Sequence, residues 1–326
     1  MPAGIKTKLD PIHQAFLEDA IALFEGTRYG HMSPWLYGRE GAPWWEAYAE
    51  NSTAAAEETL LLKRLVKSKP GAITQATEVI EAGPGAPKAV REETSRIVRA
   101  APHAKLYIPI DLSDTFHAST ADEFGKNFQD VTVYPRKANF FKRVPIRRLL
   151  KNPLLVCMGL TISNLPCNVE EESPHDVLVK ALKNLKATAQ HKGHLLVSVD
   201  AHNDGKDVVA NYDSVIVKNF YLSLITRMIH ELGLKGARES DFDYRPVWDK
   251  KHDLLSHELV IKRPLHIRLG HRSFRLKEGH RLRVNNSFKW PNGFFQEAME
   301  DAGIPPDIKL QTQRRRVTLY LAPNEP

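Results

Sequence analysis

The pattern of apolar and polar positions changes near residue 69. From there, short apolar runs alternate with amphipathic stretches, as a parallel sheet with crossover helices requires. The apolar runs predict five strands, at residues 76–80, 105–110, 131–133, 154–158 and 194–199. Strands that alternate with helices in this way predict an α/β fold with a doubly wound sheet.

The residues on either side of this alternation follow other patterns. Apolar residues at helical spacing predict helices within residues 16–24 and 57–66, with an aromatic-rich loop between them. Beyond residue 200, one or two helices are expected over residues 208–232, followed by antiparallel strands and a helix at 294–301. The strands expected there, with the last strand of the chain, are residues 254–261, 266–269, 282–286 and 317–321.

These patterns predict two lobes. We assign residues 60–205 and 285–326 to the sheet domain, and residues 1–59 and 206–284 to a second lobe that binds substrate. The aromatic segment, which includes Tyr37, belongs to this second lobe. Its aromatic density suits either packing between lobes or the wall of a ligand pocket.

Composition limits the classes of protein to consider. No apolar run is long enough to cross a bilayer, and residues 1–8 lack the apolar core of a secretory signal, so we expect a cytoplasmic protein. The net charge of +7 would suit nucleic-acid binding, but the basic residues of segment 262–283 alternate with apolar ones, as on half-solvated strands. The basic run 314–316 leads directly into the last predicted strand. We therefore expect neither a nucleic acid nor a membrane as partner, and the oligomeric state is open.

Metal and disulfide chemistry are not expected either. The chain has two cysteines, Cys157 and Cys167, too few for a disulfide framework or a cysteine zinc site. The histidines of the C-terminal strand segments have no acidic residue at ligand spacing. A protein without a metal site is the prediction.

A nucleotide site is indicated at the ends of the first two predicted strands. Gly83 and Gly85 follow the first strand, where glycines allow a tight turn and a close approach of the backbone to a ligand. Asp111 ends the second strand, where a carboxylate can accept the hydroxyl hydrogens of a ribose. Lys88 stands where a dinucleotide-binding Gly-x-Gly-x-x-Gly turn has its third glycine, and can instead serve as a counter-charge for a carboxylate.

Four longer motifs are spread over most of the chain. Residues 81–85 read Glu-Ala-Gly-Pro-Gly and residues 107–113 read Tyr-Ile-Pro-Ile-Asp-Leu-Ser. Residues 158–165 read Met-Gly-Leu-Thr-Ile-Ser-Asn-Leu, and residues 287–290 read Ser-Phe-Lys-Trp. These motifs resemble the histidine-specific methyltransferase-like family, which includes the ergothioneine-pathway histidine Nα-methyltransferase and fungal tryptophan-type N-methyltransferases. The resemblance implies a Rossmann-like methyltransferase sheet and S-adenosylmethionine (SAM) as cofactor.

The resemblance also implies roles for individual residues. The residues expected at the cofactor are those of the glycine turn, the following lysine, the acid of the second strand and two residues beside the adenine: Gly83, Gly85, Lys88, Asp111, Asn139 and Phe140. Tyr37, Asn164 and Tyr212 are expected to hold the amino and carboxylate groups of an amino-acid substrate. Asn164 and Tyr212 carry the catalytic role of orienting the acceptor nitrogen.

The substrate pocket departs from that of the histidine-binding members. They have a Glu two positions before the serine of Ser-x-Lys, and this chain has Asn285 there, before Ser287. A methionine of their pocket wall corresponds loosely to His257, and one family tyrosine has no clear match near residues 52–53. Histidine is therefore not the expected substrate. Asn285, Ser287 and His257 are candidates to bind another side chain, and a structural role for Asn285 and His257 stays open.

The sequence thus predicts a SAM-dependent N-methyltransferase of a free amino acid or a related small amine, acting in secondary metabolism. Two alternatives remain from the residues alone. One is a nicotinamide-dependent oxidoreductase, because a glycine turn and a ribose-binding acid serve both classes. The other is a non-catalytic, cofactor-binding protein of the same fold.

Overall fold

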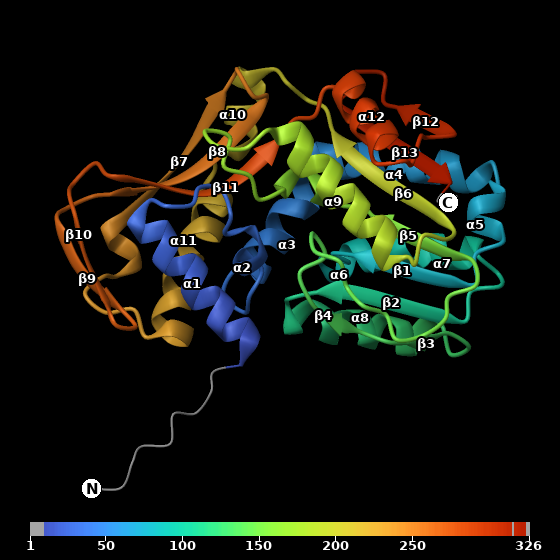
Figure 1. The fold of residues 1–326 in the computed structure, drawn as a ribbon, viewed down its shortest axis with the longest axis horizontal. Coiled ribbons are helices and arrows are strands. Elements are labelled where there is room, and N and C mark those ends of the chain that lie inside the picture. Colours follow the sequence, from blue (N-terminus) through green and yellow to red (C-terminus); the bar gives the residue numbers. More distant parts are fainter. Residues whose placement is uncertain (1–9, 315, 324–326) are drawn as a thin grey trace, which may run out of the picture.

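Eight strands form one sheet at the larger end of the molecule (Figure 1). The computed structural model describes residues 10–314 and 316–323, so residues 1–8, considered above for a secretory signal, and Arg315 of the basic run lie outside the described residues. The parallel strands are β1 (Glu78–Ala82), β2 (Leu106–Asp111), β3 (Thr132–Val133), β5 (Pro153–Cys157) and β6 (His194–Asp200). All five predicted strands are confirmed, the first displaced by two residues.

The order of the sheet is β12-β13-β6-β5-β1-β2-β3, so the winding reverses at β1. Strand β13 (Val317–Pro323) runs antiparallel to β6, and β12 (Ile308–Gln311) antiparallel to β13. A short strand, β4 (Arg136–Lys137), also runs parallel and pairs with the end of β2. The α/β class with a doubly wound sheet is therefore confirmed, and ligands of such sheets bind at the carboxyl edge beside the reversal.

Helices cover both faces of the sheet because its side chains alternate between two apolar layers. Ile80 and Ile108 face α9 (Pro174–Thr188) and α12 (Asn292–Asp301). Val79 and Tyr107 face the other layer. The helices of that layer are α4 (Thr53–Lys67), α5 (Gly71–Thr74), α7 (Ser95–Ala100) and α8 (Asp114–Asn127).

A second apolar core lies at the other end of the molecule (Figure 1). Its three-stranded antiparallel sheet contains β7 (Phe242–Asp249), β8 (Leu254–Ile261) and β11 (Arg281–Phe288). A separate hairpin contains β9 (Leu265–Leu269) and β10 (Arg272–Leu276). The helices of this part are α1 (Pro11–Glu25), α2 (Ser33–Leu36), α3 (Ala42–Asn51), α10 (Gly205–Tyr212) and α11 (Val215–Leu232).

Two details differ from the sequence-based expectation. The aromatic segment is not a loop, because α2 and α3 each have a proline in the first helical turn, Pro34 and Pro43, where proline favours a helix start. The boundary expected at residue 285 falls inside β11, which pairs with β8 along its length. In the described part of the chain, no helix is both long and apolar enough to span a membrane.

Candidate active site

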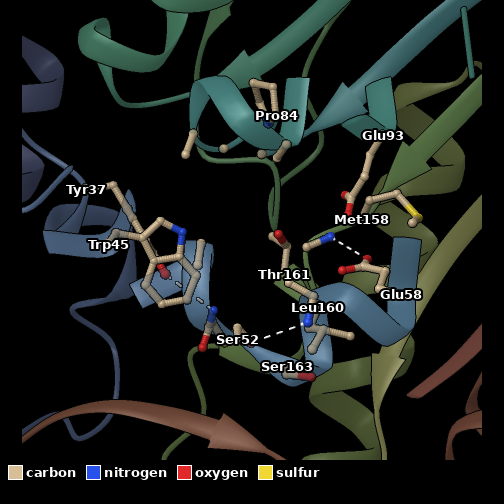
Figure 2. Close-up of a pocket in the computed structure, with 18 of the residues that line it drawn as sticks. Tyr37, Trp45, Ser52, Glu58, Pro84, Glu93, Met158, Leu160, Thr161 and Ser163 are labelled. Carbon is tan, nitrogen blue, oxygen red and sulfur yellow. Dashed lines mark hydrogen bonds between the residues drawn. The ribbon is translucent and has the colours of Figure 1, made fainter. Parts of the chain in front are cut away.

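A cavity of about 370 Å³ lies at the carboxyl edge of the parallel sheet, between the sheet and the second core. Figure 2 shows Tyr37 and Trp45 on one side of it, and Glu58 and Glu93 on the other. The structure brings ten of the twelve predicted site residues to this cavity. They are Tyr37, Gly83, Gly85, Lys88, Asp111, Asn139, Phe140, Asn164, Tyr212 and Ser287.

Gly83 has a backbone conformation that a side chain would disturb. Its φ of +71° lies in the left-handed region, and a Cβ built there would be 3.2 Å from Thr161 Cγ2 and 3.3 Å from Phe140 Cε1. The Gly83 N–H donates to the Ile110 carbonyl at 2.9 Å, which ties the turn to β2. The turn thus brings bare backbone to the cavity, as the sequence predicted.

Asp111 lies beside this turn at the end of β2. Its Oδ1 accepts the Ser113 N–H at 2.7 Å, which fixes the carboxylate at the start of α8. Burial raises the pKa of Asp111 to about 6, so the group is largely ionised at neutral pH. Asn139 and Phe140 follow β4, the strand paired with the end of β2, and line the same part of the cavity.

Asn164 holds together a group of neutral polar side chains. It ends a short 3-10 helix, η2 (Thr161–Asn164), after β5. Its Oδ1 accepts the Ser287 hydroxyl at 2.9 Å, and its Nδ2 donates to the Tyr37 hydroxyl at 3.5 Å. The Ser33 hydroxyl donates to its backbone carbonyl at 3.0 Å. Residues from three distant parts of the chain are therefore joined at one point of the cavity wall.

A buried ion pair extends this group, and the sequence analysis missed it. Lys289 Nζ lies 2.5 Å from Asp200 Oδ2 and donates to the Tyr212 hydroxyl at 3.3 Å. Both charged residues are buried and line the cavity. Their positions in the sequence could have indicated them. Asp200 ends the fifth strand as Asp111 ends the second, and Lys289 lies in the Ser-Phe-Lys-Trp motif.

Tyr48 is a second residue that the sequence analysis missed. It lies on α3, lines the cavity, and its ring centroid is 5.5 Å from that of Tyr212. Burial raises the pKa of Tyr48, Tyr37 and Tyr212, so their hydroxyls stay protonated and can donate hydrogen bonds.

His257 and Asn285 do not reach the cavity, contrary to their expected place in the substrate pocket. They face each other on β8 and β11 and are fully buried. The ring of Tyr221 stacks on His257 at 4.4 Å, and Asn285 Nδ2 donates to the Tyr221 hydroxyl at 3.2 Å. Tyr221 itself lines the cavity, so its ring separates the two residues from any ligand there.

Lys88 lies where the cavity meets the first turn after the glycines. It belongs to α6 (Pro87–Ala89), and its Nζ donates to the Glu50 carbonyl at 3.4 Å. An ammonium held by one neutral acceptor can still pair with a ligand carboxylate. Three buried acids, Glu58, Glu81 and Glu93, also line this region, and the sequence analysis assigned them no role.

The fold and the cavity define a nucleotide-binding α/β protein whose ligand lies across the carboxyl edge of a doubly wound sheet. The chain belongs to the family described as histidine-specific, SAM-dependent methyltransferases, which matches it over residues 19–324. A curated relative, the uncharacterized protein y4iF of Sinorhizobium fredii (strain NBRC 101917 / NGR234), is 26% identical over 155 residues, 47% of this chain. The chain spans about half (50%) of the length of this relative.

Two solved structures are similar at low identity. An S-adenosylmethionine-dependent methyltransferase from Clostridium acetobutylicum ATCC 824 is 11% identical, with a TM-score of 0.49 over 87% of this chain and 98% of that one. The sugar N-methyltransferase KedS8 from Streptoalloteichus sp ATCC 53650 is 12% identical, with a TM-score of 0.44 over 87% of this chain and 93% of that one. The family assignment depends on the match over residues 19–324 and not on these two structures.

The cavity residues fit SAM, the cofactor of this family. The bare backbone at Gly83 leaves room for a ligand, and the ionised Asp111 can accept the ribose hydroxyl hydrogens. Asn139 and Phe140 offer an amide and an aromatic face beside them, as an adenine requires. Lys88 could supply a positive charge for the carboxylate of the methionyl end.

Proposed function

We propose that the protein transfers a methyl group from SAM to the nitrogen of a free amino acid or a related small amine other than histidine. The observation that carries this proposal is the group around Asn164. It places an amide and three hydroxyls, those of Tyr37, Tyr212 and Ser287, on the wall of a cavity of about 370 Å³. Neutral donors and acceptors at this density suit the amino and carboxylate groups of a small molecule.

The acceptor end has the groups that methyl transfer to nitrogen needs. When bound, SAM supplies an electrophilic methyl group on a sulfonium, and the transfer is an in-line displacement. An ammonium has no lone pair, so the acceptor must lose a proton to solvent before attack. The Asn164 amide and the Tyr212 hydroxyl then orient the neutral nitrogen. The buried Lys289–Asp200 pair holds the Tyr212 hydroxyl in place.

The position of Asn285 supports the exclusion of histidine. The resemblance places an imidazole-binding Glu at this position, and here a neutral amide lies behind the Tyr221 ring instead. Position 285 therefore offers no carboxylate to an imidazole bound in the cavity. The substrate end is bordered instead by the rings of Tyr37, Tyr48, Tyr212 and Tyr221, together with Trp45.

The test is methyl transfer from isotopically labelled SAM to a panel of acceptors. The panel contains the common amino acids, including histidine, arginine and tryptophan, and small amines, and the labelled product is identified by mass spectrometry. We expect a product labelled on nitrogen with at least one amino acid or amine and none with histidine. Labelling of an oxygen acceptor or of nucleic acid would overturn the proposed substrate class. Efficient methylation of histidine would overturn the argument from position 285.

A further inference from the structure

Three buried carboxylates face the cavity on the side away from Tyr37 and Trp45. Glu58 comes from α4, Glu81 from β1, and Glu93 from a π-helical segment, η1 (Val90–Thr94). Figure 2 shows Glu58 and Glu93 together beside Met158, which follows β5. In the described part of the chain, none of the three lies within 4.0 Å of a Lys, Arg or His nitrogen.

Two of these acids occupy positions where a helix normally has an apolar residue. Glu58 begins the buried stripe of α4, which continues with Leu61, Leu62 and Leu65. Glu93 lies on the buried face that carries Val90 and Ile97. Because a buried charge without a partner is unfavourable, a carboxylate in such a stripe calls for a ligand or a partner that compensates it.

Two hydroxyls hold the Glu81 carboxyl group. Both Glu81 oxygens accept the Thr94 hydroxyl, at 3.0 and 2.9 Å, and the Tyr107 hydroxyl donates to Oε2. Two hydroxyls and the strand position give Glu81 a structural role. Glu58 accepts the Gly159 N–H at 2.7 Å and is also hydrogen-bonded by the Ser198 hydroxyl and the Leu160 N–H. Glu93 accepts the Thr59 hydroxyl at 3.0 Å. These neutral donors hold the two carboxyl groups in place but bring no positive charge to them.

The positions of these acids relative to Asp111 decide which part of SAM they meet. Asp111, with Asn139 and Phe140, would hold the nucleoside at β2 and β4. Glu58 is bonded to Gly159 after β5, and β5 lies on the opposite side of β1 from β2. A methionyl end that continues from this nucleoside across β1 would bring its ammonium and carboxylate to Glu58, Glu93 and Lys88.

We propose that Glu58 and Glu93 bind the α-ammonium group of the cofactor's methionyl end, while Lys88 faces its carboxylate. The bound ammonium supplies the positive charge that the two carboxylates lack within the protein. The proposal concerns cofactor binding alone and holds whichever acceptor the protein methylates. It also explains why two separate elements, α4 and η1, each direct an acid at the same part of the cavity.

The test compares two ligands by isothermal titration calorimetry. S-adenosylhomocysteine has the amino-acid end, whereas 5′-methylthioadenosine has the same nucleoside and thioether without it. We expect Glu58→Gln and Glu93→Gln each to weaken S-adenosylhomocysteine binding by about tenfold or more, since each removes a charge-assisted hydrogen bond. Binding of 5′-methylthioadenosine should change by less than about twofold in both. Glu57→Gln is the matched control: Glu57 is the next residue on α4 but does not line the cavity, and its substitution should leave both affinities unchanged.

A wild-type measurement keeps the test independent of variant folding. The unmodified protein should bind S-adenosylhomocysteine about tenfold or more tightly than the analogue in which hydrogen replaces the amino group. Equal affinities for these two ligands would overturn the proposal. So would equal losses for S-adenosylhomocysteine and 5′-methylthioadenosine in the glutamine variants, or no loss for either.

Discussion

Asp111 ends β2 and Asn164 follows β5, at the same edge of the sheet, yet we assign them to different ligands. Asp111→Ala removes the carboxylate placed for the ribose and should abolish detectable SAM binding. Asn164→Ala removes the amide that joins Ser287 and Tyr37 and should raise the KM for the acceptor by about tenfold, the effect of one or two lost hydrogen bonds. The SAM affinity of this second variant should stay within about twofold of the wild type.

Titration with SAM, followed by acceptor kinetics at saturating SAM, separates the two effects. We expect each variant to lose affinity for one ligand only, SAM in Asp111→Ala and the acceptor in Asn164→Ala. Damage to the fold would instead weaken the binding of both ligands in both variants. An Asp111→Ala protein that still binds SAM like the wild type would remove Asp111 from the cofactor site. An unchanged acceptor KM in Asn164→Ala would remove Asn164 from the substrate site.

The sequence was informative about single residues where a motif fixes both residue type and position. Gly83 and Asp111 were predicted because a glycine turn and a strand-ending acid are local features. Lys289 and Asp200 were missed because their pairing joins residues 89 positions apart. Glu58 and Glu93 had a local signal, an acid in an apolar stripe, but only the fold shows that both stripes end at one cavity.

Among the elements, the turn between β1 and α6 has the strictest backbone requirement at the site. Gly83→Ala would place a Cβ 3.2 Å from Thr161 Cγ2 on a residue with φ of +71°. A left-handed conformation costs a non-glycine residue about 1–2 kcal/mol. We therefore expect the free energy of unfolding to fall by about 1–2 kcal/mol. The affinity for S-adenosylhomocysteine should fall by about tenfold or more, since the turn must shift.

Gly125→Ala is the matched control for this substitution. Gly125 lies within α8, and a Cβ there meets no atom within 4 Å. Alanine should therefore stabilise the helix by about 0.5–1 kcal/mol and leave ligand affinity unchanged. Chemical denaturation and ligand titration of both variants give the comparison. Wild-type affinity in Gly83→Ala would show that the ligand does not approach this turn.

Elements with strong periodicity were predictable, and short or polar ones were not. The longer parallel strands β1, β2, β5 and β6 are buried on both faces, so they form nearly continuous apolar runs. Strand β7 was missed because only two of its eight residues are buried, Phe242 and Tyr244. The helices α2 and α3 were read as a loop because proline marks turns as well as helix starts.

For the molecule as a whole, the acids of the cavity oppose folding when no ligand is bound. Burial raises the pKa of Glu58 from 4.5 to about 7. The groups that face Glu58 do not reverse this effect. Glu81, Glu93 and Asp200 are acids, and the hydrogen bonds from Ser198, Gly159 and Leu160 lower the pKa by less than burial raises it. Between pH 4.5 and about 7 the unfolded chain has released the Glu58 proton while the folded chain retains it. Stability present below pH 4.5 is therefore lost as the pH rises to about 7.

Glu58→Gln isolates this contribution because glutamine has nearly the same shape and does not ionise. At pH 5 the variant and the wild type should have similar free energies of unfolding without ligand. At pH 8 the variant should be more stable by about 3 kcal/mol at most, the equivalent of the shift in the Glu58 pKa. Asp111 and the buried histidines are common to both proteins and cancel in the difference. The Glu58 charge also raises the pKa of Glu81 and of Glu93, so these two acids contribute to the same gap. Chemical denaturation at half-unit pH steps measures the gap, and a gap that is constant from pH 5 to pH 8 would contradict the prediction.

Saturating S-adenosylhomocysteine should stabilise the wild type more than the variant, because only the wild type pairs a charged Glu58 with the ligand ammonium. Loss of stability in the empty protein and strong cofactor binding then share one cause, an ionised carboxylate in an apolar position.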